Sequence, residues 1–277
     1  MNAAGQLTWR QWAGFMAMVV GMFMAILDIQ IVSASSSDIQ AVLAASPDEA
    51  AWVQTSYLIA EIVMIPLSGW LSRLLSTRVL FVASALGFTL FSLACAGASG
   101  LGEMIVFRAA QGFIGGAMIP TLFATSFLLF QGARRTQVSV LIGLTATLAP
   151  TIGPTLGGWL TEQLSWHWLF LINVPVGAAL AVVVWRCLDI DRPNYALFKQ
   201  FDYWGLILMA LFLGNLEYVL EEGNRWDWFQ DESIAWSGAI GAVAGILFFH
   251  RMLTMRDPMV ELRAFLDRNF VFGSLFS

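Results

Sequence analysis

Three charged side chains lie inside stretches of the sequence that are otherwise apolar: Asp28, Glu61 and Arg108. Placing a charge at the centre of a lipid bilayer costs roughly 2.5–3.5 kcal/mol, so such residues are rare and pair with one another in the protein interior. A carboxyl group held there can take up and release a proton, and a nearby guanidinium can serve as its counter-charge. These residue types therefore point to proton transfer or charge pairing within a membrane, and apolar helices must position them.

A second unusual stretch, residues 144–160, reads LTATLAPTIGPTLGGWL and combines prolines with glycines in an uncharged run. A helix interior disfavours Pro by about 3 kcal/mol and Gly by about 1 kcal/mol relative to Ala. In lipid, however, small residues let two helices approach closely. We expect Pro150, Gly153, Pro154, Gly157 and Gly158 to form one smooth face against another helix. This face is either a static packing seam or one that bends or slides during a conformational cycle.

The composition is that of a membrane protein. Hydrophobic residues make up 58% of the chain and charged residues 12%, with a mean hydropathy of +0.72, whereas a soluble domain is about 25% charged. About 20 apolar residues span a bilayer. The chain has four uncharged runs, three with a single acid each and one shorter uncharged run, at 79–102, 109–133, 136–161, 163–185, 12–34, 50–72, 203–220 and 233–249. We expect an all-α integral membrane protein with eight helices, and a ninth that begins near residue 269. A cleavable signal peptide is the alternative for the first run, but the run is longer than a signal core and contains an acid.

The basic residues predict the orientation. Twelve of the fourteen fall in alternate loops, at positions 10, 73, 78, 134, 135, 186, 192, 199, 251, 256, 263 and 268. The opposite loops contain only Arg225, among several acids, and Arg108 lies within the fourth helix. Because positive loops stay in the cytoplasm, we expect a cytoplasmic N-terminus and a location in the plasma (inner) membrane.

Asp28 and Arg108 are expected at the same depth. Asp28 lies about six residues before the outer end of the first helix, and Arg108 about six residues after the outer start of the fourth. At 1.5 Å per residue, both lie roughly 9 Å below the outer surface. Asp28 then alternates between pairing with Arg108 and holding a proton, or the two form a static ion pair, or Arg108 binds backbone carbonyls instead. Glu61, nearer mid-membrane, is a candidate proton carrier, a counter-charge for a bound cation, or a protonated acid bonded to a neighbouring helix.

The residues that could serve in catalysis or metal binding do not form a recognisable pattern in the sequence. Cys95 and Cys187 lie in apolar runs without metal-ligand spacing, and His167 and His250 lie at the ends of apolar runs. The sequence has no nucleophile–base constellation and no phosphate-binding loop. We therefore expect no enzymatic activity, no cofactor, no bound metal and no nucleic-acid partner.

Four ordered stretches resemble signatures of the major facilitator superfamily. APTIGPTLGG at 149–158 is similar to the antiporter motif on helix 5, and RAAQGFIGG at 108–116, with Gln111 and Gly112, to the helix 4 motif. WHWLFLINVPVG at 166–177 resembles the helix 6 signature, with His167 in place of an arginine. Residues 201–223 look like the first of two extra central helices in fourteen-helix members. From about Leu27 onward, the chain is similar to the EmrB/QacA-type drug:proton antiporter family.

The resemblance has departures. The helix 1 motif keeps Asp28, but Gln30, Ser33 and Ser37 replace its Thr, Asn and Pro. After the second helix, Arg73 occupies the position of an acid in the superfamily's cytoplasmic motif. Without this acid, the resemblance does not support the usual cytoplasmic charge relay between the two halves, whereas the expected fold is unchanged.

Family members are about twice as long as this chain. We expect a six-helix transporter bundle at 1–188, two extra central helices at 189–254, and a cytoplasmic linker with the truncated start of the second bundle at 255–277. A facilitator binds its substrate between two bundles, so the chain is expected to be the N-terminal portion of a transporter that lacks its C-terminal bundle.

The resemblance implies proton-coupled efflux of amphiphilic drugs or toxic compounds. Its implied partners are protons, a small amphiphilic substrate, the lipid bilayer, the missing C-terminal bundle and a periplasmic adaptor protein. One alternative is a solute importer of the same fold, against which the antiporter motif and the extra central helices argue. Another is a non-transporting membrane protein, which the missing half favours.

Cysteine labelling tests the orientation. In a background without the native cysteines, Asp227→Cys is expected to react with a membrane-impermeant maleimide added to spheroplasts, because its loop faces outward. Arg134→Cys should react only after permeabilisation. Labelling of position 227 from the cytoplasmic side alone would contradict the predicted topology.

Overall fold

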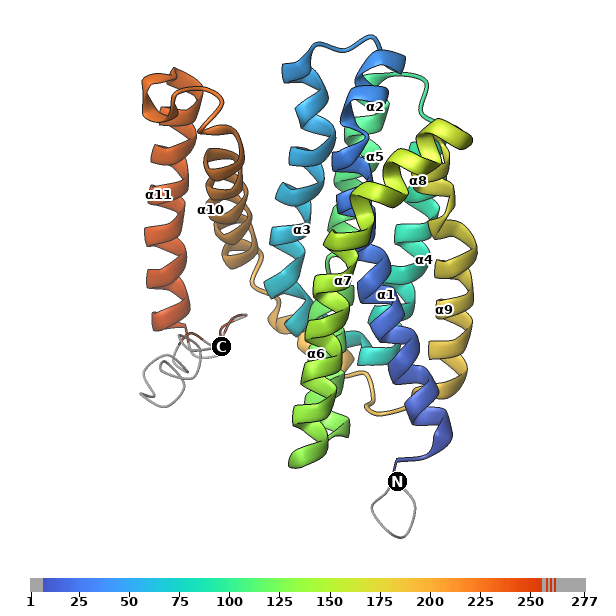
Figure 1. Ribbon diagram of the computed structural model, residues 1–277. Helices are drawn as coiled ribbons and strands as arrows, with labels where there is room; N and C mark the ends of the chain where they lie inside the picture. The colour runs from blue at the N-terminus through green and yellow to red at the C-terminus, as the bar shows by residue number, and fades with distance from the viewer. Residues whose placement is uncertain (1–6, 256–257, 259, 261, 263–277) are drawn as a thin grey trace. The chain divides into compact units, whose positions relative to one another are not determined.

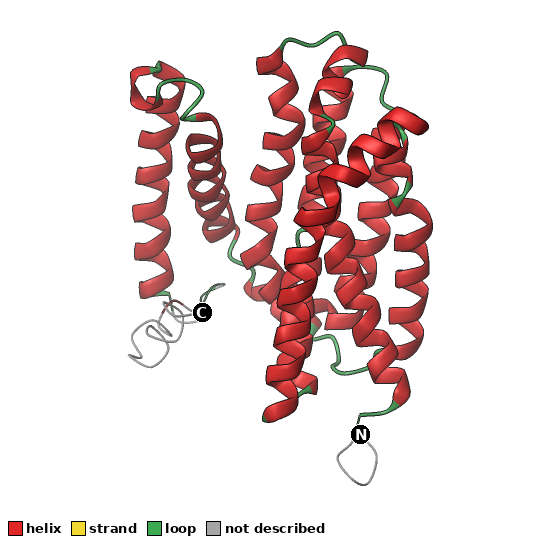
Figure 2. Ribbon diagram, in the orientation of Figure 1, coloured by secondary structure: helices red, strands yellow, loops and turns green. Residues whose placement is uncertain are grey.

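The computed structural model describes residues 7–255, 258, 260 and 262, and this part of the chain consists of helices and connections without a β-strand (Figure 2). Within it, eight helical spans are long and apolar enough to cross a membrane, which confirms the expected all-helical membrane fold. The chain divides into two compact units, Met1–Asn194 and Tyr195–Ser277. Six of the spans lie in the first unit and two in the second. The expected ninth helix near residue 269 lies outside the described residues.

Figure 1 labels most of the helices. Those of the first unit are α1 (Trp9–Ala34), α2 (Ser36–Val42), α3 (Pro47–Leu75), α4 (Thr77–Ala96), α5 (Leu101–Gly115), α6 (Met118–Leu129), α7 (Ala133–Gln163), α8 (Trp168–Leu171) and α9 (Asn173–Cys187). The second unit has the 3₁₀ turns η1 (Tyr195–Gln200) and η2 (Trp228–Gln230), with α10 (Tyr203–Glu222) and α11 (Glu232–Thr254).

Two long helices begin at capping boxes. The Thr8 hydroxyl accepts a hydrogen bond from the Gln11 backbone N–H at the start of α1, and the Gln11 side chain accepts one from the Thr8 N–H in return. Ser46 and Glu49 make the same exchange at the start of α3, where Pro47 takes the first helical position. These contacts satisfy N–H groups that have no partner within the helix.

Several of the uncharged runs extend beyond the ends of the helices that they contain. The run 79–102 passes the end of α4 at Ala96 and enters α5, which begins at Leu101. The run 163–185 covers a connection and two helices, α8 and α9, and the short α2 was not expected. An uncharged run shows only that the segment can lie in lipid. The helix ends depend on capping residues: Gly97 is the C-cap of α4, and Gly100 is the N-cap of α5.

Helix α1 occupies the centre of the first unit and packs against α7, α9 and α6, and α7 runs across it in Figure 1. Its Phe15, Met18 and Met22 are buried in one core with Phe81 and Phe88 of α4. A further close pair is α3 with α5. The first unit is therefore organised around a helix that few lipid molecules can contact.

The Gly/Pro stretch lies in α7, and some of its residues form the expected close contact with α1. A side chain at Gly153 would collide with Cβ of Gln30. A Cβ atom at Gly157 would lie 2.8 Å from the carbonyl oxygen of Ile31. Ala149, one turn earlier on the same face, is fully buried. The stripe 149, 153 and 157 thus lets two backbones meet.

The prolines and the last glycine lie elsewhere, so the expectation of a single smooth face is wrong. Pro150 and Pro154 are exposed, and nothing lies within 4 Å of the place where Gly158 would carry a Cβ atom. Successive helix residues point about 100° apart. Positions 150, 154 and 158 therefore form a separate stripe beside the packed one.

Glycines also bring α3 and α5 together. A Cβ at Gly112 would collide with the carbonyl oxygen of Tyr57, and one at Gly116 would lie 3.0 Å from the carbonyl oxygen of Glu61. Four residues separate the members of each pair along both helices, so the two helices run side by side in one register. This register places Tyr57 and Glu61 of α3 beside the C-terminal end of α5.

After α9, the chain returns to the junction of α3 and α4. The carboxylate of Asp191 accepts hydrogen bonds from the Thr77 backbone N–H at 2.9 Å and from the Thr77 hydroxyl at 2.7 Å. The Asn194 N–H donates to the carbonyl of Leu74 at 3.1 Å. An acid at a helix N-terminus is favourable, and these bonds join residues 189–194 to the first unit.

In the second unit, an ion pair joins α10 to α11. Asp202 caps α10 and lies 2.8 Å from Nη2 of Arg251 on α11. Burial by itself would raise the pKa of Asp202, but hydrogen bonds from Arg251 and from the Gly205 N–H hold that pKa below its ordinary value. The pair therefore persists at neutral pH and is lost only when acid protonates Asp202.

The α1–α7 contact predicts the effect of added volume. Gly157→Leu should force α7 away from Ile31 and lower the free energy of unfolding by about 1–3 kcal/mol, the usual cost of overpacking. Gly158→Leu is the matched control, because the neighbouring position has open space. Thermal unfolding in detergent checks this, and equal stability of the two variants would contradict the close contact.

Candidate functional site

Asp28 and Arg108 meet in the interior of the first unit. Nη1 of Arg108, on α5, lies 2.6 Å from Oδ2 of Asp28, on α1, and both side chains are 0% exposed. The structure thus brings together the two residues that were expected to share a depth. The Coulomb attraction between two charges this close is stronger away from water than at a surface, but further hydrogen bonds are needed to offset their loss of hydration.

Neutral polar side chains supply these bonds around the carboxylate. Asn173, the first residue of α9, donates to Oδ1 of Asp28 at 2.6 Å. Gln111 accepts from Nη1 of Arg108 at 2.7 Å, and its amide nitrogen donates to the Ser92 hydroxyl on α4 at 2.7 Å. Each side chain is buried. The network therefore connects α1, α4, α5 and α9 through one carboxylate.

The guanidinium has further partners on the side of α3 and α8. Nε of Arg108 donates to the carbonyl oxygen of Val53 at 3.3 Å. The guanidinium carbon lies 4.2 Å from the ring centroid of Tyr57 and 5.8 Å from that of Phe170. Among the described residues, Nη2 of Arg108 and the Tyr57 hydroxyl are buried without a hydrogen-bond partner.

Most of the remaining residues that the sequence singled out lie in the network or on one of the two helix contacts. Gln111 belongs to the network, and Gly112 acts through the close approach of α3. Glu61 is buried one turn after Tyr57 on α3, within electrostatic range of the Tyr57 hydroxyl. Of the antiporter-motif residues, Gly153 and Gly157 contact α1 at Gln30 and beyond, just past Asp28.

Four network residues were not singled out from the sequence: Ser92, Asn173, Tyr57 and Phe170. Asn173 and Phe170 lie in the helix 6 signature, which marked the stretch but assigned no partner. Ser92 lies in an apolar run, where a single serine is an ordinary packing residue. Only the fold shows that these side chains surround one charge pair.

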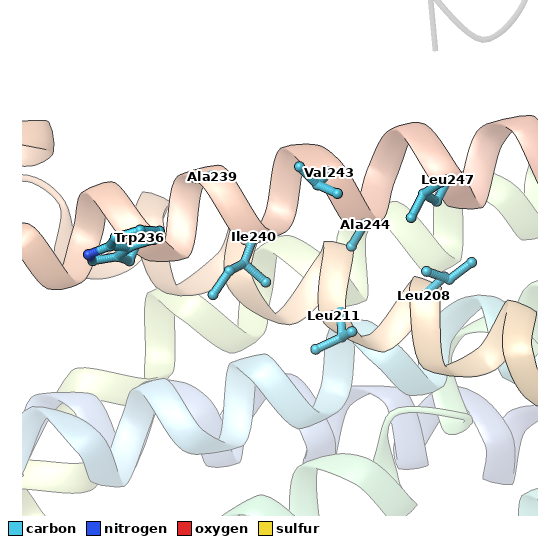
Figure 3. A pocket seen from close by; sticks show the side chains of 8 residues that line it. All are labelled: Leu208, Leu211, Trp236, Ala239, Ile240, Val243, Ala244 and Leu247. Atoms are coloured by element: carbon cyan, nitrogen blue, oxygen red, sulfur yellow. The ribbon is translucent and has the colours of Figure 1, made fainter.

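A concavity lies between α10 and α11, with a volume of about 340 Å³. Figure 3 shows its eight lining side chains, which are aliphatic except for a single tryptophan. It has no charged group that could bind a proton or a cation. Within the described residues, no cluster of His, Cys, Asp and Glu could hold a metal ion.

Asp28 is the group of this network that would take up a proton, because Arg108 already carries its proton and Asn173, Gln111 and Ser92 are neutral amides and a hydroxyl. Protonation of Asp28 would remove the ion pair while Asn173 and Gln111 keep the carboxyl group in place. The carboxyl group is shared by helices that pack on either side of α1, so a change in its charge alters their mutual attraction.

Removing one charge tests the pairing. Arg108→Gln leaves a buried carboxylate without a counter-charge, and we expect a loss of about 3–5 kcal/mol in the free energy of unfolding near neutral pH. The Asp28→Asn/Arg108→Gln double variant has no stranded charge and should be more stable than Arg108→Gln. Thermal unfolding of the complete gene product in detergent checks this, and a double variant less stable than the single one would contradict the direct pair.

Known proteins resemble this chain over nearly its whole length. The family model described as Major Facilitator Superfamily matches residues 18–266. The Colistin resistance protein EmrB of Acinetobacter baumannii is 47% identical over 99% of this chain and 55% of its own length. The Fatty acid resistance protein FarB of Neisseria gonorrhoeae is 34% identical over 92% of this chain and 50% of its own. The Multidrug export protein EmrB of Escherichia coli K12 is 33% identical over 94% of this chain and 50% of its own.

The chain spans about half the length of the curated relatives it matches. The match of the family model extends over most of the chain and includes the residues of the buried network. The chain belongs to the Major Facilitator Superfamily, within which it is similar to EmrB-type multidrug exporters.

Proposed function

We propose that this chain forms the proton-coupling half of a multidrug exporter that expels amphiphilic compounds in exchange for protons. The observation that carries the proposal is the buried Asp28–Arg108 pair at the junction of α1 and α5. The names of the relatives, which refer to drug export and to colistin and fatty acid resistance, support the direction of transport. They do not favour an importer or a non-transporting protein.

In this proposal Asp28 is the proton carrier. A proton from the outer side binds the carboxylate, which becomes neutral and releases its ion pair with Arg108. The helices that share Asp28 then change their packing, and the proton leaves to the cytoplasm when the pair forms again. Each proton that enters along the membrane potential supplies about 2.3 kcal/mol per 100 mV.

We assign Glu61 and the α1–α7 contact additional roles in the same proton cycle. Glu61 is buried on the α3–α5 seam, where it acts as a second proton carrier or as the counter-charge for cationic substrates. The stripe of Gly153 and Gly157 lets α7 slide along α1 during the cycle. Pro150, Pro154 and Gly158 form the separate stripe of the same helix. Gln111 holds Arg108 in place, and Gly112 lets α3 approach.

The proposal also covers the membrane, the orientation of the chain and its partners. We place the chain in the plasma (inner) membrane with its N-terminus in the cytoplasm, because of the distribution of basic loops. The substrate site forms with a C-terminal bundle, since facilitators bind substrate between two halves. Residues 1–188 act as the first bundle, to which residues 189–194 are joined, and α10 and α11 act as accessory helices. A periplasmic adaptor protein is the proposed partner for export across the envelope.

Variants of the pair test the coupling. Asp28→Asn, Arg108→Gln and the double variant of the complete gene product should each lose proton-driven drug efflux in everted membrane vesicles, by at least tenfold per inserted molecule. The reason is that none of them can exchange a proton against an ion pair. Immunoblots of the membrane fraction provide the normalisation. Restored efflux in the double variant would mean that the pair is purely structural.

Glu61→Gln tests the second acid. The substitution keeps the shape and hydrogen-bonding capacity of the side chain and removes its charge and its proton. Efflux of cationic drugs should fall more than that of neutral drugs if Glu61 is a counter-charge, and proton uptake should fall for both if it is a carrier. Unchanged efflux and unchanged proton uptake would reduce Glu61 to a structural residue.

A further inference from the structure

Arg108 has a set of partners that do not depend on the charge of Asp28. These are the Gln111 amide oxygen, the Val53 carbonyl oxygen and the faces of two aromatic rings, Tyr57 and Phe170. A cation within about 6 Å of a ring centroid is attracted by the negative face of the ring, and the attraction is strongest where water is excluded. Both rings and the guanidinium are fully buried.

The position of Tyr57 follows from the helix seam. A side chain at Gly112 would collide with the Tyr57 carbonyl oxygen, so the glycine is what lets α3 come this close to α5. Val53, one turn before Tyr57 on α3, provides the carbonyl oxygen for Nε of Arg108. The ring of Tyr57 therefore lies over the guanidinium because the backbones touch, and its hydroxyl, which has no partner among the described residues, is not what holds it.

We propose that Tyr57 and Phe170 form an aromatic cage that holds the charge of Arg108 while Asp28 carries a proton, so that the two rings set the pH at which Asp28 exchanges its proton. This proposal rests on the proposed function, because it assigns positioning residues to the same proton cycle. It concerns the state in which the ion pair is absent, when a buried cation would otherwise be stranded.

The sign of the effect follows from charge. When Asp28 is ionised, the pair is neutral overall, and the attraction of the rings for the guanidinium is partly offset by their repulsion of the carboxylate. When Asp28 is protonated, only the attraction remains. The cage thus favours the protonated state, and its removal must make protonation require a higher proton concentration.

Other groups near the pair are few among the described residues. Tyr57 on α3 and Cys95 on α4 lie within electrostatic range of both Asp28 and Arg108, and Glu61 lies within range of Tyr57. Asn173 and Ser92, from α9 and α4, are uncharged. The described titratable groups that face the pair or its nearest ring are therefore Tyr57, Cys95 and Glu61.

The experiment measures the protonation of Asp28 directly. Infrared difference spectra of the complete gene product in lipid are recorded over a pH series, and the band of the protonated carboxyl group is assigned by its loss in Asp28→Asn. At position 57, Tyr is replaced by Phe and by phenylalanines with one, two and three ring fluorines. Fluorine weakens the negative ring face while it keeps the ring, so folding is preserved.

We expect Tyr57→Phe to keep the pH midpoint of the wild type, because the ring remains. The midpoint should fall stepwise with fluorination, to about one pH unit lower for the trifluorinated ring, which is a tenfold higher proton concentration. Tyr57→Leu should show a shift in the same direction. Phe15→Leu removes another fully buried ring, which packs against Phe130 thirteen residues before Asp28 on α1, and should leave the midpoint unchanged.

Three results would overturn the proposal, and they are distinguishable. If the Asp28 band titrates in the wild type but its midpoint does not change with fluorination, the cage has no role while the proposed proton cycle stands. The same holds if Tyr57→Phe alone shifts the midpoint, because the hydroxyl would then be responsible. If the wild type shows no Asp28 band at any pH, Asp28 holds no proton, and the coupling itself fails.

Discussion

A carboxylate and a guanidinium that leave water together constrain the first unit more than any other contact does. Each buried ion loses its hydration, and their mutual attraction offsets this loss only when further polar groups complete both hydrogen-bond shells. Asp28 and Arg108 lie 2.6 Å apart with no exposure, so the partners must come from the helices around them. Asn173 donates to the carboxylate and Gln111 accepts from the guanidinium, while Ser92 accepts from Gln111; among the described residues, only Nη2 of Arg108 in this network lacks a partner. The pair and its partners therefore fix the relative positions of α1, α4, α5 and α9.

The approach of the helix backbones depends on glycine, since hydrophobic burial does not drive helix association within lipid. Gly112 and Gly116 bring α3 against α5, and Gly153 and Gly157 bring α7 against α1. One seam involves the helix that carries Arg108, and the other involves the helix that carries Asp28. A bundle that holds a charge pair rigidly on a polar network, yet joins its helices by smooth seams, suits a protein whose helices must shift when the charge changes.

The junction of α3 and α4 is held by charged residues from the segment that follows α9. Arg73 occupies the position where the superfamily motif has an acid. Asp191, from the segment after α9, places its carboxylate at the N-terminus of α4, where it binds Thr77. Arg78 nearby lies 3.6 Å from Asp189 and contacts the Trp185 ring. Charge at this junction is therefore balanced by a later part of the chain.

The sequence by itself determined the class of fold and the depth of the charges. Apolar runs long enough for a bilayer predict the spans, because lipid excludes charge and demands internal hydrogen bonding of the backbone. The common depth of Asp28 and Arg108 follows from residue rise alone. Tertiary structure alone decided which face of each helix meets a neighbour. In α7, the spacing of small residues did not reveal that Gly153 packs while Pro150 is exposed. Ser92 and Tyr57 became site residues only through contacts between helices distant in sequence, which no local pattern encodes.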